Sequence, residues 1–140
     1  MAKRVGLLTA GSDSPGVNAA IRGFGKAAAS TYQMEVVGFR DGFLGLIEDR
    51  KLTFEGSTLS GILTQGGTIL GTSLQVPDSI QKNGSTVDLT EDAIAGYHAN
   101  ALDALVIIGD RPVQQAAYKL AQRGLNIVTL PKAADNDIPG

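Results

Sequence analysis

The sequence contains no cysteine, no tryptophan and a single histidine, and it has no long hydrophobic run. Without cysteine there is no disulfide bond, thiolate nucleophile or cysteine metal site, which fits a reducing compartment, so we expect a cytoplasmic protein. The first apolar run ends at Gly11, too early for a signal peptide or a membrane helix, and we expect no membrane association. His98 has no second histidine or cysteine to share a metal, and we assign it no function.

An excess of charge of one sign is also lacking. The chain has 12 lysine and arginine residues against 14 aspartate and glutamate residues, a formal net charge of −2. Because these charges are mixed along the chain, nothing favours nucleic acid or an anionic membrane as partner. Small molecules and proteins remain. The length of 140 residues predicts one domain, residues 1–140.

Short apolar stretches alternate with patterns that are typical of helices. The predicted strands are residues 4–10, 35–40, 104–108 and 126–130. The predicted helices are residues 17–32, 43–47, 90–100 with Thr90 as N-cap, and 113–123, closed by Gly124. Between residues 50 and 89 the signal is weak: residues 59–63 fit a helix, and residues 77–85 are typical of a loop.

Strands that are nearly continuous in apolar residues and alternate with helices predict an α/β protein. We expect a doubly wound, mostly parallel sheet with helices on both faces. Ligands bind such sheets beyond the carboxyl ends of the strands. The unusual loops all fall at that edge: GSDSPG (11–16), FRDGF (39–43), GDRPV (109–113) and PKAADNDIPG (131–140).

The first of these loops places Gly11 and Gly16 five residues apart before a predicted helix. Backbone N–H groups and the helix N-terminus there are suited to an anion. Val17 stands where a Walker loop requires lysine, and the dinucleotide GxGxxG pattern is absent. The spacing therefore leaves two interpretations open, a phosphate site and a tight turn capped by Asp13 or Ser14.

The last loop carries Asp135-Asn136-Asp137 just beyond a predicted strand. A carboxylate in this position could deprotonate a hydroxyl group. Aspartate and asparagine are also ordinary turn formers, and taken alone this stretch favours a turn.

Three separated motifs together resemble the 6-phosphofructokinase family. The chain has KRVGLLTAGSDSPGVNAAIRG, GGTILGTS and GLNIVTLPKAADNDIPG, where the family reads GGDSPG(M/L)NAAIR, RGGTILGTSR and P(G/K)TIDND, in the same order and spacing. The resemblance covers nearly all 140 residues but only the first part of the family's longer chain. It implies the family's Rossmann-like large-domain fold, an oligomer, and phosphoryl transfer from ATP or pyrophosphate to the 1-hydroxyl of fructose 6-phosphate with Mg²⁺.

The resemblance also implies roles for individual residues. Asp135 matches the catalytic base, and Asp137 matches the neighbouring acidic residue beside the reacting phosphate. Lys132 resembles a lysine of branches that include pyrophosphate users, and Arg22 matches an effector-site arginine or is simply a solvated helix charge. The remaining donor-site positions are Gly11, Ser12, Gly66, Gly67, Gly109 and Asp110.

Several positions depart from the family pattern. Ser12 replaces a glycine, while Gln65 and Leu74 replace arginines that would neutralise phosphate charge. Ala133 and Ala134 replace the threonine and isoleucine of TIDND, so a hydroxyl group that would contact the substrate is absent.

The largest departure is GDRPV, which aligns with the family's GGDGS or GGGGT loop. Asp110 lies one position early for the magnesium-binding aspartate, so it is a weak metal candidate. Pro112 removes an N–H donor, and Val113 removes a hydroxyl group.

Two functional hypotheses follow. The first is phosphofructokinase-type phosphoryl transfer that these replacements impair, since several donors to the phosphates are lost. The alternative is a catalytically inactive, truncated or engineered derivative that acts as a binding or structural domain. In either case an unpaired sheet edge favours self-association.

Overall fold

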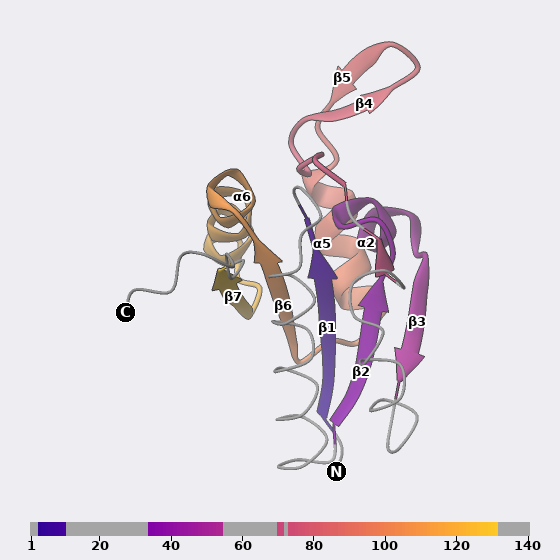
Figure 1. Cartoon of the computed structure of the whole chain (residues 1–140), viewed down its shortest axis with the longest axis vertical. Coiled ribbons are helices and arrows are strands. Elements are labelled where there is room, and N and C mark those ends of the chain that lie inside the picture. Colours follow the sequence, from indigo (N-terminus) through magenta and orange to yellow (C-terminus); the bar gives the residue numbers. More distant parts are fainter. Residues whose placement is uncertain (1–2, 11–33, 55–69, 72, 132–140) are drawn as a thin grey trace, which may run out of the picture.

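The computed structural model describes residues 3–10, 34–54, 70–71 and 73–131. The predicted helices 17–32 and 59–63 lie outside these ranges. Figure 1 shows the strands β1 (Lys3–Thr9), β2 (Met34–Phe39), β3 (Lys51–Phe54), β4 (Ile80–Lys82), β5 (Ser85–Val87), β6 (Ala104–Gly109) and β7 (Ile127–Pro131). The helices are α2 (Phe43–Glu48), α5 (Thr90–Ala99) and α6 (Arg111–Gln122).

Five of these strands form one sheet in the order β3-β2-β1-β6-β7. β1, β2, β6 and β7 are parallel, and β3 pairs with β2 in the antiparallel direction. The chain builds one half of the sheet outward from β1 through β2 to β3, then continues on the other side of β1 with β6 and β7. The predicted α/β class with a mostly parallel sheet is confirmed, and the strand order reverses between β1 and β6.

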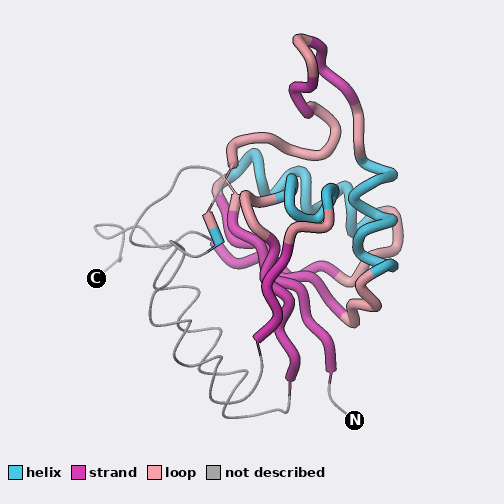
Figure 2. The backbone as a smooth tube through the Cα atoms, turned by 90° about the vertical axis from the view of Figure 1, so that its right-hand side faces the viewer, coloured by secondary structure: helices cyan, strands magenta, loops and turns pink. Residues whose placement is uncertain are grey.

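Both faces of the sheet are apolar and buried. On one face Leu8, Phe39 and Ile107 belong to a buried cluster that includes Phe43 of α2 and Leu120 of α6. Figure 2 shows the helices as a layer beside the strands. The opposite face is also buried, and its apolar side chains are Val5, Leu7, Val36, Val106 and Ile108. A sheet buried on both faces accounts for strands that are almost continuously apolar in sequence.

The stretch between β3 and α5 corrects the prediction for residues 77–85. Instead of a loop, part of it forms the two-stranded hairpin β4–β5, which projects from the body of the chain (Figure 1). Asn83 and Gly84 connect the strands with φ angles of 52° and 80°. Two positive φ angles in succession are typical of the hairpin turn that Asn-Gly favours, so the dipeptide was the signal that the prediction overlooked.

The starts of two helices also differ from expectation. α5 begins at Thr90 as predicted, but Thr90 does not act as its cap: its N–H and Oγ1 donate to Asp88 Oδ1 at 3.0 and 2.6 Å. The hydroxyl donation from Thr90 lowers the pKa of the Asp88 carboxyl. α6 begins at Arg111, two residues earlier than predicted, because Pro112 is acceptable in the first turn of a helix.

Candidate functional site

The candidate site is the carboxyl edge of the sheet around the ends of β1 and β6. The Ala10 N–H donates to the Ile108 carbonyl at 3.0 Å, so the β1–β6 pairing extends to the rim. A reversal of strand order at this point opens a crevice in α/β sheets, and ligands bind there. The predicted loops FRDGF and GDRPV follow β2 and β6 at this edge, as expected.

Two of the predicted site residues, Gly109 and Asp110, fall within the described ranges, and both lie at the end of β6. Leu74, which replaces a family arginine, is 75% exposed. The other predicted site residues lie outside the described residues: Gly11, Ser12, Arg22, Gly66, Gly67, Lys132, Asp135 and Asp137.

Gly109 is enclosed by the chain itself. A Cβ atom at this position would lie 2.5 Å from Val113 Cγ1 and 2.9 Å from the Ala10 carbonyl oxygen. Val113 is only 2% exposed, and its isopropyl group occupies the space above the glycine. Close packing of α6 on the end of β6 therefore explains this glycine without a ligand.

The start of α6 combines features that favour and oppose anion binding. Asp110 is the N-cap residue, but its side chain makes no capping hydrogen bond. Its carboxylate stands beside the positive end of the helix, where it competes with a bound anion. Pro112 has no N–H to donate. Arg111 is exposed and makes no ion pair with any described residue, so it is the cation available at this helix start.

Thr9 and Asp41 are functional candidates that the sequence did not reveal. Thr9 Oγ1 donates to the Gly71 carbonyl at 2.9 Å, and the Asp41 N–H donates to the Leu70 carbonyl at 2.8 Å. Gly71 has φ 72°, and a Cβ atom there would lie 2.7 Å from Asp41 Oδ1. Two hydrogen bonds and one glycine contact thus hold the end of the GGTILGTS motif at the carboxyl edge.

An ion pair supports the turn at Asp41. Asp41 has a φ angle of 59°, which a non-glycine residue adopts at some cost. Arg50 donates from its guanidinium to Asp41 Oδ2 at 2.6 Å, and this hydrogen bond raises the pKa of Arg50. The Asp41-Gly42 dipeptide is the sequence signal for the turn, but its contact with residues 70–71 joins segments distant in sequence.

Replacing Thr9 with valine tests this attachment. Valine keeps the shape of the side chain but removes the Oγ1 donor, so we expect a loss of about 1 kcal/mol in unfolding free energy. We also expect amide exchange at Gly71 and Ser73 to accelerate about fivefold. Hydrogen exchange followed by mass spectrometry measures this change, with Thr86→Val on the exposed hairpin as control. Unchanged exchange at residues 70–73 would contradict the attachment.

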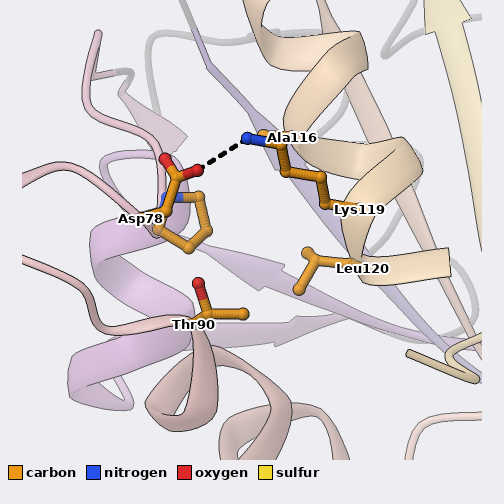
Figure 3. A pocket seen from close by; sticks show the side chains of 6 residues that line it. Asp78, Thr90, Ala116, Lys119 and Leu120 are labelled. Atoms are coloured by element: carbon orange, nitrogen blue, oxygen red, sulfur yellow. Dashed lines mark hydrogen bonds and ion pairs between the residues drawn. The ribbon is translucent and has the colours of Figure 1, made fainter. Parts of the chain in front are cut away.

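A separate hollow lies between α6, the start of α5 and the segment before β4 (Figure 3). Pro77, Thr90, Ala116 and Leu120 line it, and Lys119 Nζ meets Asp78 Oδ2 across it at 2.8 Å. The surface around it adds the ion pair of Arg123 with Glu91, and also Asp88. Both cations are therefore paired, and carboxylates outnumber them, so this hollow does not suit a phosphate group.

The residues that the structure describes do not form a metal centre. Among the residues that it describes, no three histidine, cysteine, aspartate or glutamate side chains gather to hold an ion. Asp110 therefore lacks companion ligands within these residues, and they do not form a magnesium site by themselves. In the same ranges, no helix has the length and apolar content that crossing a membrane requires.

The mostly parallel sheet and the reversal of its strand order between β1 and β6 define an α/β protein of the doubly wound class. The family model of phosphofructokinase matches residues 4–140. The chain therefore belongs to the phosphofructokinase family.

Individual relatives agree with this assignment. The chain is 51% identical over 140 residues to an ATP-dependent 6-phosphofructokinase from Propionibacterium freudenreichii subsp. shermanii, covering 100% of the chain and 38% of the relative. It is 45% identical over 139 residues to ATP-dependent 6-phosphofructokinase 3 from Bacteroides thetaiotaomicron, covering 98% of the chain and 41% of that relative. Among solved structures, T-state Pichia pastoris phosphofructokinase superposes with a TM-score of 0.76 at 27% identity, over 100% of this chain and 16% of that one. The chain thus spans well under half the length of these relatives.

Proposed function

We propose that this chain carries out phosphofructokinase-type phosphoryl transfer from ATP or pyrophosphate to fructose 6-phosphate, at a rate that its own replacements reduce. The observation that carries this proposal is the assembly of one edge from three segments. The loop after β2, the loop after β6 and the end of the GGTILGTS motif lie at the carboxyl edge. Hydrogen bonds from Asp41 and Thr9 join the loop after β2 and the end of β1 to residues 70–71 of that motif. This is where the doubly wound class binds its ligands.

In this proposal Asp135 is the base that takes the proton of the sugar 1-hydroxyl, and Asp137 lies beside the transferring phosphate. The backbone of Gly11, Ser12, Gly66 and Gly67 approaches the donor phosphates, and Lys132 offsets their charge. Both carboxylates follow β7, whose carboxyl end lies next to that of β6. Magnesium would accompany a polyphosphate donor, but no step of the proposal depends on a metal held by the described residues.

The structure supports the reduced rate through the loop that follows β6. Phosphoryl transfer depends on donors placed in advance around the phosphates, and the loss of one such donor costs about a hundredfold. Here Pro112 lacks an N–H, Asp110 adds negative charge, and Leu74 supplies an exposed apolar side chain in place of a cation.

The second candidate is a catalytically inactive derivative that binds small-molecule phosphates or serves as a structural domain. One observation favours it: the buried isopropyl group of Val113 lies 2.5 Å from where a Cβ of Gly109 would be, so helix packing already uses the space over this glycine. A donor phosphate needs that backbone to be open.

A coupled assay with fructose 6-phosphate separates the two candidates. Turnover with either ATP or pyrophosphate that disappears in Asp135→Asn supports transfer. Calorimetric titration of both donors and of the sugar phosphate completes the test. No turnover with either donor, beside an active full-length relative, rejects the first candidate, and the titration then decides whether binding remains.

A further inference from the structure

The tip of the β4–β5 hairpin is an asparagine followed by a glycine, and the hairpin projects from the body of the chain (Figure 1). Asn83 and Gly84 are both exposed, and they connect the paired residues Lys82 and Ser85. The sequence contains no second Asn-Gly dipeptide. Positive φ angles explain why these two residue types form the turn, but they give the side-chain amide of Asn83 no role.

Two groups at this tip are free to react with each other. Neither the side-chain amide of Asn83 nor the N–H of Gly84 has a hydrogen-bond partner among the residues that the structure describes. The hydrogen bond from Gln81 Nε2 to Thr86 Oγ1, at 2.8 Å, lies further from the tip. A Cβ atom at Gly84 would meet nothing within 4 Å, so the space around its peptide group is open.

The other two asparagines in the described ranges are held by hydrogen bonds. Asn100 is 5% exposed, and its Nδ2 donates to the Gly96 carbonyl at 2.8 Å. Asn126 donates from Nδ2 to the Asp103 carbonyl at 2.9 Å. Alanine and isoleucine follow these two asparagines, and a side chain in that position hinders approach to the backbone nitrogen. The fold therefore engages both of these amides and leaves that of Asn83 free.

We propose that Asn83 is a site of spontaneous deamidation. The backbone nitrogen of Gly84 loses its proton and attacks Cγ of Asn83. A bond forms between these atoms, the bond from Cγ to Nδ2 breaks, and Nδ2 takes a proton from water and leaves as ammonia. Water then opens the resulting five-membered succinimide ring at either carbonyl, which yields aspartate or isoaspartate at position 83. Water is the only other reactant.

The hairpin is able to adopt the conformation that ring closure requires. Each of its strands has three residues, and residues 81–86 are all exposed. A two-stranded hairpin of this size is only marginally stable in water, so opening its tip costs little free energy. The reaction therefore needs no unfolding of the five-stranded sheet.

The products should alter the tip of the hairpin and leave its base unchanged. Isoaspartate carries the main chain through its Cβ atom, which lengthens the two-residue turn, and either product adds one negative charge to the formal net charge of −2. At the base, the Leu89 N–H donates to the Pro77 carbonyl at 2.7 Å, and Lys119 pairs with Asp78 at 2.8 Å. We expect faster amide exchange at Thr86 in the isoaspartate form, with an unchanged urea midpoint. Unchanged exchange at Thr86 would contradict this effect on the turn.

Incubation of the 140-residue chain at mildly alkaline pH, followed by fragmentation mass spectrometry, tests the proposal. We expect Asn83 to gain the mass of one deamidation about tenfold or more faster than Asn100 and Asn126, because only glycine leaves the attacking nitrogen unhindered. A higher pH should accelerate the conversion, since it deprotonates more of the Gly84 N–H. A protease that cleaves before aspartate but not before isoaspartate separates the two products. Conversion of Asn83 no faster than that of Asn100 and Asn126 overturns the proposal.

Two variants test whether the Gly84 nitrogen is the nucleophile. Gly84→Ala places a methyl group beside that nitrogen, in open space, and should slow the conversion about tenfold. Asn83→Gln keeps the amide group but needs a six-membered ring, so it should stay unconverted. Circular dichroism verifies the fold of both variants, because alanine is strained at a φ angle of 80°. Conversion of Gly84→Ala at the parent rate overturns the proposal.

Urea separates the effect of the fold from that of the sequence. Asn83 should convert in the folded chain at a rate within about tenfold of its rate in urea, because the tip opens at little cost. The inference is independent of whether the chain transfers phosphoryl groups, and the readout needs no substrate. A folded chain in which Asn83 stays intact, while it reacts in urea, would show that the hairpin protects it and would overturn the proposal.

Discussion

The Gly109→Ala variant is expected to lose about 3 kcal/mol of unfolding free energy, although the change adds only one methyl group. The methyl carbon would lie 2.5 Å from Val113 Cγ1, 2.7 Å from Val113 Cβ and 2.9 Å from the Ala10 carbonyl oxygen. Valine is stiff about χ1 and cannot swing away, so α6 must move from the end of β6. Urea denaturation measures the loss as a lower midpoint at unchanged slope.

A double-mutant cycle with Val113→Ala tests the cause. Shortening Val113 removes the nearest atom, so the double variant should be more stable than the sum of the single changes predicts, by about 1 kcal/mol or more. The double variant should still be less stable than the Val113→Ala variant, because the added methyl group at residue 109 remains too close to the Ala10 carbonyl oxygen. Additive effects would show that Val113 is not what constrains Gly109.

Substituting residues 110–112 in the loop after β6 is expected to have the largest effect on ligand binding. The triple variant Asp110→Gly, Arg111→Asp and Pro112→Gly restores the family's GGDG stretch: it removes a carboxylate, returns an N–H donor and places an acidic residue in the family register. We expect affinity for the magnesium–ATP complex or pyrophosphate to rise on the order of a hundredfold, the scale that one well-placed donor reaches in catalysis. Isothermal titration calorimetry measures it.

The structure indicates that the substitutions in this loop should not extend to Val113. Val113 is 2% exposed and belongs to the core cluster, so completing the motif with serine would bury a hydroxyl group in apolar surroundings. Pro112→Ala serves as the matched control, because it restores only the N–H group and should recover part of the gain. Unchanged affinity in both variants would show that this loop does not limit donor binding.

The fold was largely predictable because its core strands are apolar without interruption. Strands β1, β2, β6 and β7 lie within one or two residues of the predicted ranges, since burial on both faces leaves no polar alternation to confuse the pattern. β3 was missed because Lys51 and Thr53 interrupt its apolar residues. The hairpin was missed because its strands are short and its outer residues are polar and exposed.

The candidate site was predictable only where its residues lie close together in the sequence, within one motif. The motif positions Gly109 and Asp110 were predicted at the carboxyl edge, and they lie there. The contacts from Thr9 and Asp41 to residues 70–71 could not be predicted, because they join segments that come together only when the sheet forms. Likewise, no motif indicates that Val113 fills the space over Gly109.

The reversal of strand order between β1 and β6 has a consequence for the order in which a ribosome produces this sheet. Val5 of β1 pairs with Val36 on one side and with Ala104 on the other. Val36 lies about thirty residues downstream of Val5, and Ala104 lies about a hundred residues downstream. During synthesis, β1, β2 and β3 are available long before β6 emerges. One side of the central strand therefore stays unpaired until β6 has been synthesised, and a chaperone that shields apolar strands would act during that interval.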